Sequence, residues 1–275
     1  MKTITKKAYA KINLYLDVTN KREDGYHNIL SVMHTVGIYD TVTVKRASDI
    51  SMICSDPTLS VGDDNLCIKA ARAFFDAAKI KDGCFIELEK HLPREAGLGG
   101  GSADAAAVLK ALNDLYGEIF CEGELCAIGA RIGADVPFCV RGGSALAEGI
   151  GEILSPFPLL PPCHIVVCEG KEKVSTPLAY QKLDGIAPSK TGDIVRLKSA
   201  MEKNDLGAIG KALYNRFEDI YPDCSLLKSV MTESGAEGAL MSGSGSAVFG
   251  LFSKKTDAER AYGKLVSSSI KAFLI

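Results

Sequence analysis

The strongest local signal in this chain is the segment Pro93-Arg-Glu-Ala-Gly97-Leu-Gly-Gly-Gly101-Ser-Ala-Asp104. Four of the five residues from Gly97 to Gly101 are glycine, so consecutive backbone amides can turn inward around an anion. A helix predicted to begin at Ser102 adds the positive end of its dipole. The segment therefore predicts a phosphate site, and the alternative is a tightly packed glycine turn. The apolar side of the predicted helix consists of Ala105, Ala106, Leu109, Leu112 and Tyr116.

The glycine spacing excludes two common nucleotide-binding patterns. No lysine follows the glycines where G-x-x-x-x-G-K-[ST] requires one. If Gly97 and Gly99 are the first two glycines of G-x-G-x-x-G, the last position of that pattern is Ser102. The predicted phosphate loop therefore belongs to another class.

Periodic apolar residues predict strands and helices around this loop. Polar and apolar residues alternate over 11–18, which predicts a strand with one buried face and with Lys11 and Asn13 together on the other. Asp63-Asp-Asn65 precedes a helical apolar stripe over 66–78. Further strands are predicted at 41–46, 84–90, 163–168 and 247–252, and further helices near 193–213, 224–234 and 256–268.

A proline-rich segment divides the chain. Prolines 156, 158, 161 and 162 lie within 155–162, a stiff stretch that no helix or central strand tolerates. We therefore predict two domains, 1–155 and 156–275, each built from both strands and helices. The predicted fold class is α+β.

Bulk composition excludes several classes of protein. Of the 275 residues, 47% are hydrophobic and 24% charged, which is typical of a packed globular chain. The net charge of -2 lacks the basic excess of nucleic-acid binders. No stretch approaches the ~20 apolar residues needed to span a bilayer, and 1–10 lacks the apolar core of a signal peptide.

Cysteine and histidine usage predicts a reducing compartment and no protein-held metal. The nine cysteines contain no C-x-x-C pair, so we interpret them as reduced core residues of a cytoplasmic protein. His34, His91 and His164 show no metal-ligand spacing and are interpreted as structural. The sequence carries no prediction of the oligomeric state.

Several spaced segments together resemble the GHMP kinases. The phosphate loop resembles the central loop of that family, and the resemblance extends in family order from residue 8 to residue 250. Ala10-Lys-Ile-Asn-Leu14, Asp24-Gly-Tyr-His27 and Glu148-Gly-Ile-Gly-Glu152 resemble in particular the 4-diphosphocytidyl-2-C-methyl-D-erythritol kinases. The other similar segments are Gly133-Ala-Asp-Val-Pro137, which resembles the catalytic aspartate segment, and Met241-Ser-Gly-Ser-Gly245-Ser-Ala, which resembles a third glycine-rich motif.

The resemblance implies a fold and a reaction. It implies a two-domain GHMP kinase fold, with an N-terminal domain like ribosomal protein S5 domain 2, a ferredoxin-like C-terminal domain and an active site in the interdomain cleft. The implied reaction is transfer of phosphoryl from ATP, with Mg²⁺, to the 2-hydroxyl of 4-diphosphocytidyl-2-C-methyl-D-erythritol in the non-mevalonate isoprenoid pathway. The alternatives are another GHMP kinase acting on mevalonate, homoserine or a sugar, and a non-catalytic nucleotide-binding protein.

Two residues are implied to be catalytic. A kinase that acts on an alcohol needs a base near the hydroxyl, and Asp135 in Gly133-Ala-Asp-Val-Pro137 is the candidate. Lys11 would stabilise charge on the reacting oxygens. Without the resemblance, Asp135 is a helix cap before Pro137 and Lys11 is a solvated strand lysine.

The resemblance also implies the residues of two ligand sites. In the acceptor site, Tyr26 would stack on cytosine with Tyr180 on its other face, and His27 would hydrogen-bond the base edge. Val174-Ser-Thr-Pro-Leu-Ala-Tyr180 resembles the segment in which Thr176 would supply a hydroxyl contact. Without the resemblance, His27 is a structural histidine, Tyr180 is a core or surface tyrosine and Asn13 fills a sheet edge. Asn65 and Ser102 are then ordinary helix caps, and Leu66 is a core residue. The remaining acceptor residues are Asn13 and Ile150, and the nucleotide residues are Asn65, Leu66, Gly97, Leu98, Gly99, Gly100, Gly101, Ser102 and Ala103.

Overall fold

The computed structural model describes residues 2–170, 175–221 and 224–275, which form two compact units. Strands β1 (Thr3–Lys21) and β2 (His27–Ala47) contribute residues to both units. The units therefore do not follow a single cut of the chain, and the domain boundary at 155/156 stays a prediction. The first unit contains Met1–Lys11, Gly37–Arg94 and Gly99–Gly142, and the second contains Ile12–Val36, Glu95–Leu98 and Gly143–Ile275.

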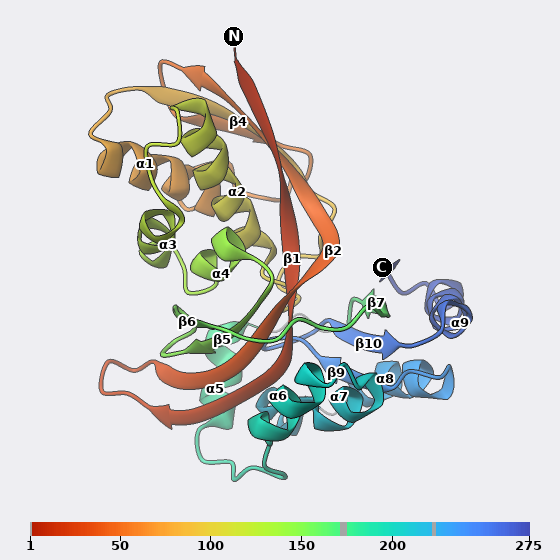
Figure 1. Cartoon of the computed structure of the whole chain (residues 1–275). Coiled ribbons are helices and arrows are strands. Elements are labelled where there is room, and N and C mark those ends of the chain that lie inside the picture. Colours follow the sequence, from red (N-terminus) through yellow and green to blue (C-terminus); the bar gives the residue numbers. More distant parts are fainter. Residues whose placement is uncertain (1, 171–174, 222–223) are drawn as a thin grey trace. The chain divides into compact units, whose positions relative to one another are not determined.

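The first unit combines a mixed sheet with helices (Figure 1). Strand β4 (Gly83–Glu89) pairs in parallel with β3 (Ser51–Cys54) and antiparallel with β2, where Val44 lies opposite Ile86. The helices of this unit are α1 (Leu66–Ala78), α2 (Gly100–Leu115), α3 (Glu122–Ala130) and α4 (Val136–Arg141).

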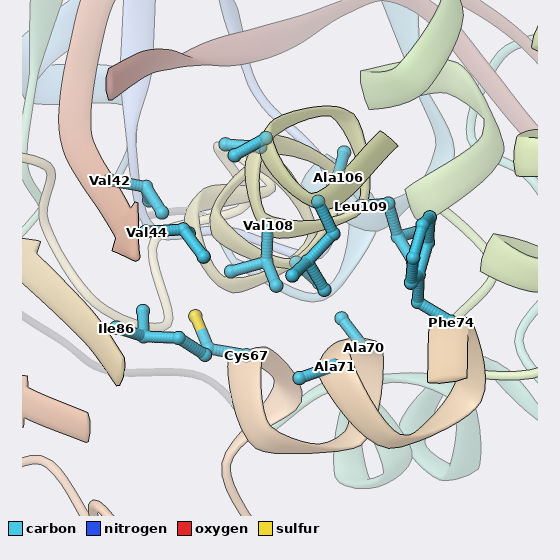
Figure 2. Close-up of a cluster of buried hydrophobic side chains, with 14 of the residues drawn as sticks. Val42, Val44, Cys67, Ala70, Ala71, Phe74, Ile86, Ala106, Val108 and Leu109 are labelled. Atoms are coloured by element: carbon cyan, nitrogen blue, oxygen red, sulfur yellow. The ribbon is translucent and has the colours of Figure 1, made fainter. Parts of the chain in front are cut away.

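The core of the first unit lies between its sheet and helices α1 and α2 (Figure 2). Phe74 on α1 is fully buried, as is Leu109 on α2, because both helices carry apolar residues at helical spacing and pack against each other. The strands supply Val44 and Ile86 to the same core. The predicted helix over 66–78 is confirmed as α1. Helix α2, which begins with the glycines, packs against α1 in this core.

The second unit contains a four-stranded antiparallel sheet in the order β11-β7-β10-β9. Helix α8 (Cys224–Glu233) follows β7 in the chain and α9 (Lys255–Ser267) follows β10, and both pack on this sheet. The resulting β-α-β-β-α-β pattern is ferredoxin-like, as predicted. The strands are β7 (His164–Cys168), β9 (Gly238–Met241), β10 (Val248–Phe252) and β11 (Ala272–Leu274).

The other elements of the second unit are short. Strand β5 pairs with β2 and β6, and β8 pairs in parallel with β1. Pro156 ends β6, consistent with the predicted proline break. These elements are β5 (Ser144–Glu148), β6 (Ile153–Pro156), β8 (Tyr214–Asn215), α5 (Thr176–Leu183), α6 (Ile194–Glu202), α7 (Leu206–Ala212) and the 3-10 helix η1 (Arg216–Asp219).

The predicted helix over 193–213 and the predicted strand over 11–18 differ from the structure. The helix predicted over 193–213 is two helices, because Asn204 adopts a left-handed conformation (φ 54°) and the Asp205 side chain caps α7. The strand over 11–18 does not have one exposed face, since Lys11 and Asn13 are as buried as their apolar neighbours. The alternation of polar and apolar residues predicted the strand correctly, but it did not predict that the second face of the strand is also covered.

The state of the cysteines and the character of the helices can be compared with what the composition predicts. All nine cysteines are free thiols, of which three are buried and one, Cys121, is exposed. Among the helices of residues 2–170, 175–221 and 224–275, none is long and apolar enough to cross a membrane.

Candidate functional site

Lys11 and Asp135, the two predicted catalytic residues, form an ion pair in the first unit. Lys11 Nζ lies 3.5 Å from Asp135 Oδ2, and the Lys11 side chain is almost fully buried whereas that of Asp135 is 29% exposed. Asp135 occupies the N-cap position of α4, but its side chain makes no capping hydrogen bond. The structure therefore does not support the helix-cap alternative, and it leaves a carboxylate that is partly open to a reactant.

Gly99 gives Lys11 room beside this ion pair. A Cβ at Gly99 would lie 3.0 Å from Lys11 Cγ and 3.7 Å from Asp135 Oδ2, and its φ of 68° disfavours other residues. Gly99 is also the N-cap of α2. The ion pair thus lies beside the helix start that the sequence predicts to bind phosphate.

The N-terminus of α2 presents backbone donors. Helix α2 begins at Gly100, two residues before the predicted start, and the first amide that closes an intrahelical bond is that of Ala103, which donates to Gly99 O at 2.8 Å. The amides of Gly100, Gly101 and Ser102 therefore precede the helical ladder, at the positive end of the dipole. Such a terminus suits a phosphate group.

Gly97 serves packing within the second unit. Ser242 Oγ donates to Gly97 O at 2.9 Å, and a Cβ at Gly97 would lie 2.0 Å from Ser242 O. Ala247 N donates to Ala96 O at 3.0 Å. The glycine-rich segment at 241–247 therefore holds residues 96 and 97 of the predicted phosphate loop through one side-chain and one backbone hydrogen bond, and the close approach of Ser242 O requires glycine at 97. Leu98 is buried and contributes its side chain to packing.

The predicted adenine residues lie in the same unit as α2. Asn65 caps α1, since its Oδ1 accepts from Cys67 N at 2.8 Å, and its Nδ2 donates to Ser60 O at 2.6 Å. Its alternative as a helix cap is thus correct, and its contact with adenine stays a prediction. Leu66 Cδ1 lies 3.4 Å from the position of a Cβ at Gly101, so Leu66 adjoins the start of α2.

A buried cluster of three charged residues beneath the start of α2 was not predicted from the sequence. Lys90 Nζ donates to Asp40 Oδ2 at 2.5 Å and to Asp104 Oδ2 at 2.8 Å, and all three side chains are at most 7% exposed. Asp40 Oδ1 also accepts from His91 N and Leu92 N. Because Asp104 is on α2 and Asp40 on β2, the cluster ties the phosphate-loop helix to the sheet.

The electrostatics of this cluster follow from burial. Burial raises the pKa of Asp104 to about 7, opposed by the charge of Lys90 and assisted by that of Asp40. Burial alone would lower the pKa of Lys90, but the two carboxylates together raise it. Asp104 Oδ1 is buried and has no hydrogen-bond partner among the described residues, which fits a carboxyl group that holds a proton near neutral pH.

We expect this cluster to make the free energy of unfolding fall as pH rises from about 4 to about 7. The folded protein keeps the Asp104 proton to about pH 7, whereas the unfolded chain releases it near 3.8, so the folded state binds more protons in this window. In Asp104→Asn, the decrease in the free energy of unfolding over this pH range should be smaller by on the order of 1–4 kcal/mol. Chemical denaturation over this pH range measures both proteins, and an equally steep fall in Asp104→Asn would contradict the assignment.

The second unit brings two of the predicted acceptor residues together. The rings of His27 and Tyr180 stack with centroids 4.9 Å apart at an interplanar angle of 19°. Tyr180 also meets the buried Phe217 edge-on at 5.0 Å. Tyr26 is 60% exposed. Tyr180 thus supports His27, and the predicted cytosine sandwich between Tyr26 and Tyr180 stays a prediction.

His27 has a charged partner that the sequence did not reveal. Its Nε2 lies 2.8 Å from Asp184 Oδ1, and the other oxygen of this carboxylate accepts from Lys21 Nζ at 2.5 Å. Lys21 first, and His27 second, hold the pKa of Asp184 below its ordinary value. No local pattern could have indicated this contact, because His27 and Asp184 are 157 positions apart.

The remaining predicted acceptor residues have structural partners in the second unit. Asn13 is buried and its Nδ2 donates to Ser31 Oγ at 2.8 Å. Thr176 Oγ1 lies 2.9 Å from Ser244 Oγ, which links α5 to the third glycine-rich motif. Ile150 N donates to Glu152 Oε2 at 2.7 Å within a tight turn. Val174, at the start of the predicted Thr176 segment, lies outside the described residues.

Comparison with known proteins assigns the family. The GHMP kinases N terminal domain matches residues 65–143, and the GHMP kinases C terminal family matches residues 197–271. The 4-diphosphocytidyl-2-C-methyl-D-erythritol kinase of Acetivibrio thermocellus is 39% identical, over 100% of this chain and 99% of the relative. The two family matches lie on either side of the predicted boundary at 155/156.

Solved structures agree with this assignment. A crystal structure of 4-(cytidine 5'-diphospho)-2C-methyl-D-erythritol kinase has a TM-score of 0.82 and 34% identity, covering 98% of each chain. The mevalonate kinase of Methanococcus jannaschii has a TM-score of 0.76 over 99% of this chain and 98% of its own, but at 14% identity it shows the fold alone. The resemblance and the predicted two-domain α+β fold are confirmed. This chain belongs to the family of 4-diphosphocytidyl-2-C-methyl-D-erythritol kinases within the GHMP kinases.

Proposed function

We propose that this chain transfers the terminal phosphoryl group of ATP to the 2-hydroxyl of 4-diphosphocytidyl-2-C-methyl-D-erythritol, a step of the non-mevalonate route to isoprenoid precursors. The observation that carries the proposal is the ion pair of Lys11 and Asp135 beside Gly99, at the N-terminus of α2. A base, a cation and a phosphate-binding helix end are the parts that phosphoryl transfer to an alcohol requires.

Each part has one task in the proposed reaction. The amides of Gly100 to Ser102 hold the donor phosphates, so negative charge meets the positive end of α2. Asp135 Oδ2 accepts the proton of the hydroxyl while the hydroxyl oxygen bonds to the terminal phosphorus of ATP and the bond from that phosphorus to the departing ADP breaks. The ammonium of Lys11 lies close enough to hold the carboxylate in place and to stabilise charge on the transferring group.

In the proposed site, Mg²⁺ would be bound mainly by phosphate oxygens and water, and by few protein oxygens. Mg²⁺ keeps several waters and takes one or two protein oxygens beside phosphate oxygens. Within residues 2–170, 175–221 and 224–275, no group of three or more His, Cys, Asp or Glu side chains would hold a metal. Ser102 on the first turn of α2 would supply a hydroxyl oxygen, and the ion would neutralise charge that builds up on the phosphates.

Cytosine recognition is assigned to Tyr26, His27 and Tyr180 in the second unit, and adenine recognition to Asn65 and Leu66. The support for the cytosine assignment is the aromatic stack of His27 on Tyr180, which presents an imidazole edge in a fixed orientation. Asn13, Ile150 and Thr176 complete the proposed acceptor contacts.

Composition supports the proposed cytoplasmic location and the proposed small-molecule partners. The nine free cysteines support a cytoplasmic location, where thiols stay reduced. The net charge of -2 supports small-molecule partners and no nucleic acid.

An acceptor panel tests the proposed function. With ATP and Mg²⁺, we expect kcat/KM for the cytidylylated methylerythritol to exceed that for mevalonate or homoserine by at least about 10³-fold, because a site built to hydrogen-bond a base rejects ligands that lack it. Preference for mevalonate or homoserine would assign a different GHMP activity. Binding of ATP without turnover of any acceptor would favour the non-catalytic alternative.

We expect His27→Ala to raise the acceptor KM by about 5- to 100-fold and to leave the KM for ATP nearly unchanged, since one base contact is worth about 1–3 kcal/mol. Tyr180→Ala should act in the same direction, because Tyr180 supports the His27 ring. His164→Gln, a change at a half-buried histidine on β7, is the control. Steady-state kinetics measure all three, and a higher KM for ATP with an unchanged acceptor KM would contradict the assignment.

A further inference from the structure

We propose that Asp184 is a positioning residue that fixes the tautomer of His27, so that the histidine meets its ligand with Nδ1 as a hydrogen-bond acceptor and selects a base that carries an exocyclic amino group. This inference rests on the proposed function, since it concerns how the proposed acceptor site distinguishes cytosine from uracil.

The carboxylate of Asp184 is an obligatory acceptor at its contact with His27. Lys21 donates a hydrogen bond to one oxygen at 2.5 Å, which is the largest cause that lowers the pKa of Asp184, so the carboxyl group is ionised at neutral pH. An ionised carboxylate can only accept hydrogen bonds. Nε2 of His27, 2.8 Å from the other oxygen, must therefore carry a proton and donate it.

A proton on Nε2 determines the chemistry of the other ring nitrogen. In a neutral imidazole one nitrogen donates and the other accepts, so the Nδ1 of His27 presents a lone pair. Lys21 already balances the charge of Asp184, so the contact does not require an imidazolium ion. The carboxylate thus acts on the ligand through the ring, without touching the ligand itself.

The orientation of the ring is fixed as well as its tautomer. The imidazole stacks nearly parallel on Tyr180, and Tyr180 is in turn held edge-on by the buried Phe217. The His27 side chain is 8% exposed, whereas Asp184 is 36% exposed. A rigid ring with one defined acceptor discriminates between ligands better than a mobile one, because it cannot rotate to offer a donor.

The acceptor at Nδ1 distinguishes the two pyrimidine bases. Cytosine has an amino donor at position 4, and uracil has an oxygen acceptor there. An acceptor facing position 4 gains a hydrogen bond with cytosine and meets lone-pair repulsion with uracil. Fixing the tautomer therefore favours a cytidine ligand over a uridine ligand.

The first test reads the tautomer directly. Long-range proton–nitrogen NMR of the ¹⁵N-histidine-labelled full chain at about pH 8, above the ordinary histidine pKa of about 6.5, distinguishes the Nε2–H form, the Nδ1–H form and the imidazolium ion. We expect the Nε2–H form for His27, assigned by comparison with His27→Gln. An Nδ1–H or imidazolium spectrum would overturn the inference.

The second test reads the consequence for binding. Calorimetry with cytidine diphosphate and uridine diphosphate should give the wild type a preference for the cytidine ligand of at least about 10-fold, which Asp184→Asn should reduce to about 3-fold or less. Asparagine can donate to Nε2 as well as accept from it, so it removes the constraint on the ring.

The Lys21→Met variant separates the tautomer from the ion pair. It keeps the Asp184 carboxylate and its contact with Nε2, so we expect it to retain most of the preference for the cytidine ligand. An equal loss in Lys21→Met and Asp184→Asn would overturn the proposal in favour of a purely electrostatic or packing role.

The experiments distinguish a wrong assignment of Asp184 from a wrong assignment of the kinase activity. If the wild type phosphorylates the cytidylylated methylerythritol but His27 is in the Nδ1–H form, only the inference about Asp184 falls. If the wild type transfers no phosphoryl group, the proposed function falls, and the NMR spectrum and the ratio of the two diphosphate affinities still decide the role of Asp184.

Discussion

Replacing Asp135 by asparagine is expected to lower kcat by about 10²–10⁴-fold while both ligands still bind. Asparagine keeps the size of the side chain but cannot readily accept the hydroxyl proton. The structure strengthens this expectation, because the Asp135 carboxylate does not cap α4 and instead lies 3.5 Å from Lys11 Nζ. A loose transition state would place the loss at the lower end of the range.

Lys11→Met should also depress kcat, because it removes a buried positive charge beside the base. If Lys11 and Asp135 act as a unit, the double variant should lose less than the product of the two single losses. Steady-state kcat, with ligand affinities measured separately on folded proteins, tests both statements.

The ion pair of Lys6 and Asp114 provides the matched control. It lies in the same unit at 2.5 Å, with both side chains about one-third exposed, and no chemistry is assigned to it. Asp114→Asn and Lys6→Met should leave kcat unchanged. Turnover of Asp135→Asn close to that of Asp114→Asn would remove Asp135 as the base and leave positioning and phosphate stabilisation to account for catalysis.

Gly97→Ala is expected to lower the free energy of unfolding by at least about 3 kcal/mol. The added Cβ would lie 2.0 Å from Ser242 O, a backbone atom held by its own hydrogen-bonded segment, and the φ of 73° is unfavourable for alanine. Either the loop or the segment at 241–247 must move. Chemical denaturation measures the loss, and ATP affinity should fall with it because the loop residues shift.

Gly100→Ala is the control for Gly97→Ala in the same loop. A Cβ at Gly100 meets no atom closer than 3.5 Å, and Gly100 lies in the first turn of α2. We expect a change within about 1 kcal/mol in either direction, because alanine favours the helix and contacts Lys90 and Leu92 normally. Equal losses in the two variants would show that close backbone contact does not explain the glycine at 97.

Strong local patterns were enough to predict several elements from the sequence. The apolar spacing over 66–78 predicts the helix that the structure has there, and the glycines before Ser102 predict a helix start whose binding of an anion stays a prediction. The family resemblance pointed to Lys11 and Asp135. All of these rest on spacing or on short motifs, which neighbouring residues along the chain define.

Contacts between residues that are distant in the sequence became known from the folded structure. The sequence could not show that Lys11 is buried, because period two describes one strand and not what covers its second face. The sequence motif does not distinguish the glycines of the loop from one another. In the structure, a Cβ at Gly97 would collide with the backbone oxygen of Ser242, whereas the atoms nearest to a Cβ at Gly100 belong to side chains.

The partners of His27 and Asp104 lie far away in the sequence. Asp184 is 157 positions from His27. Asp40 is 50 positions from Lys90, which donates hydrogen bonds to both Asp40 and Asp104. Local propensity carries no information about such pairs, because they form only when packing brings their elements together and burial changes their charge equilibria.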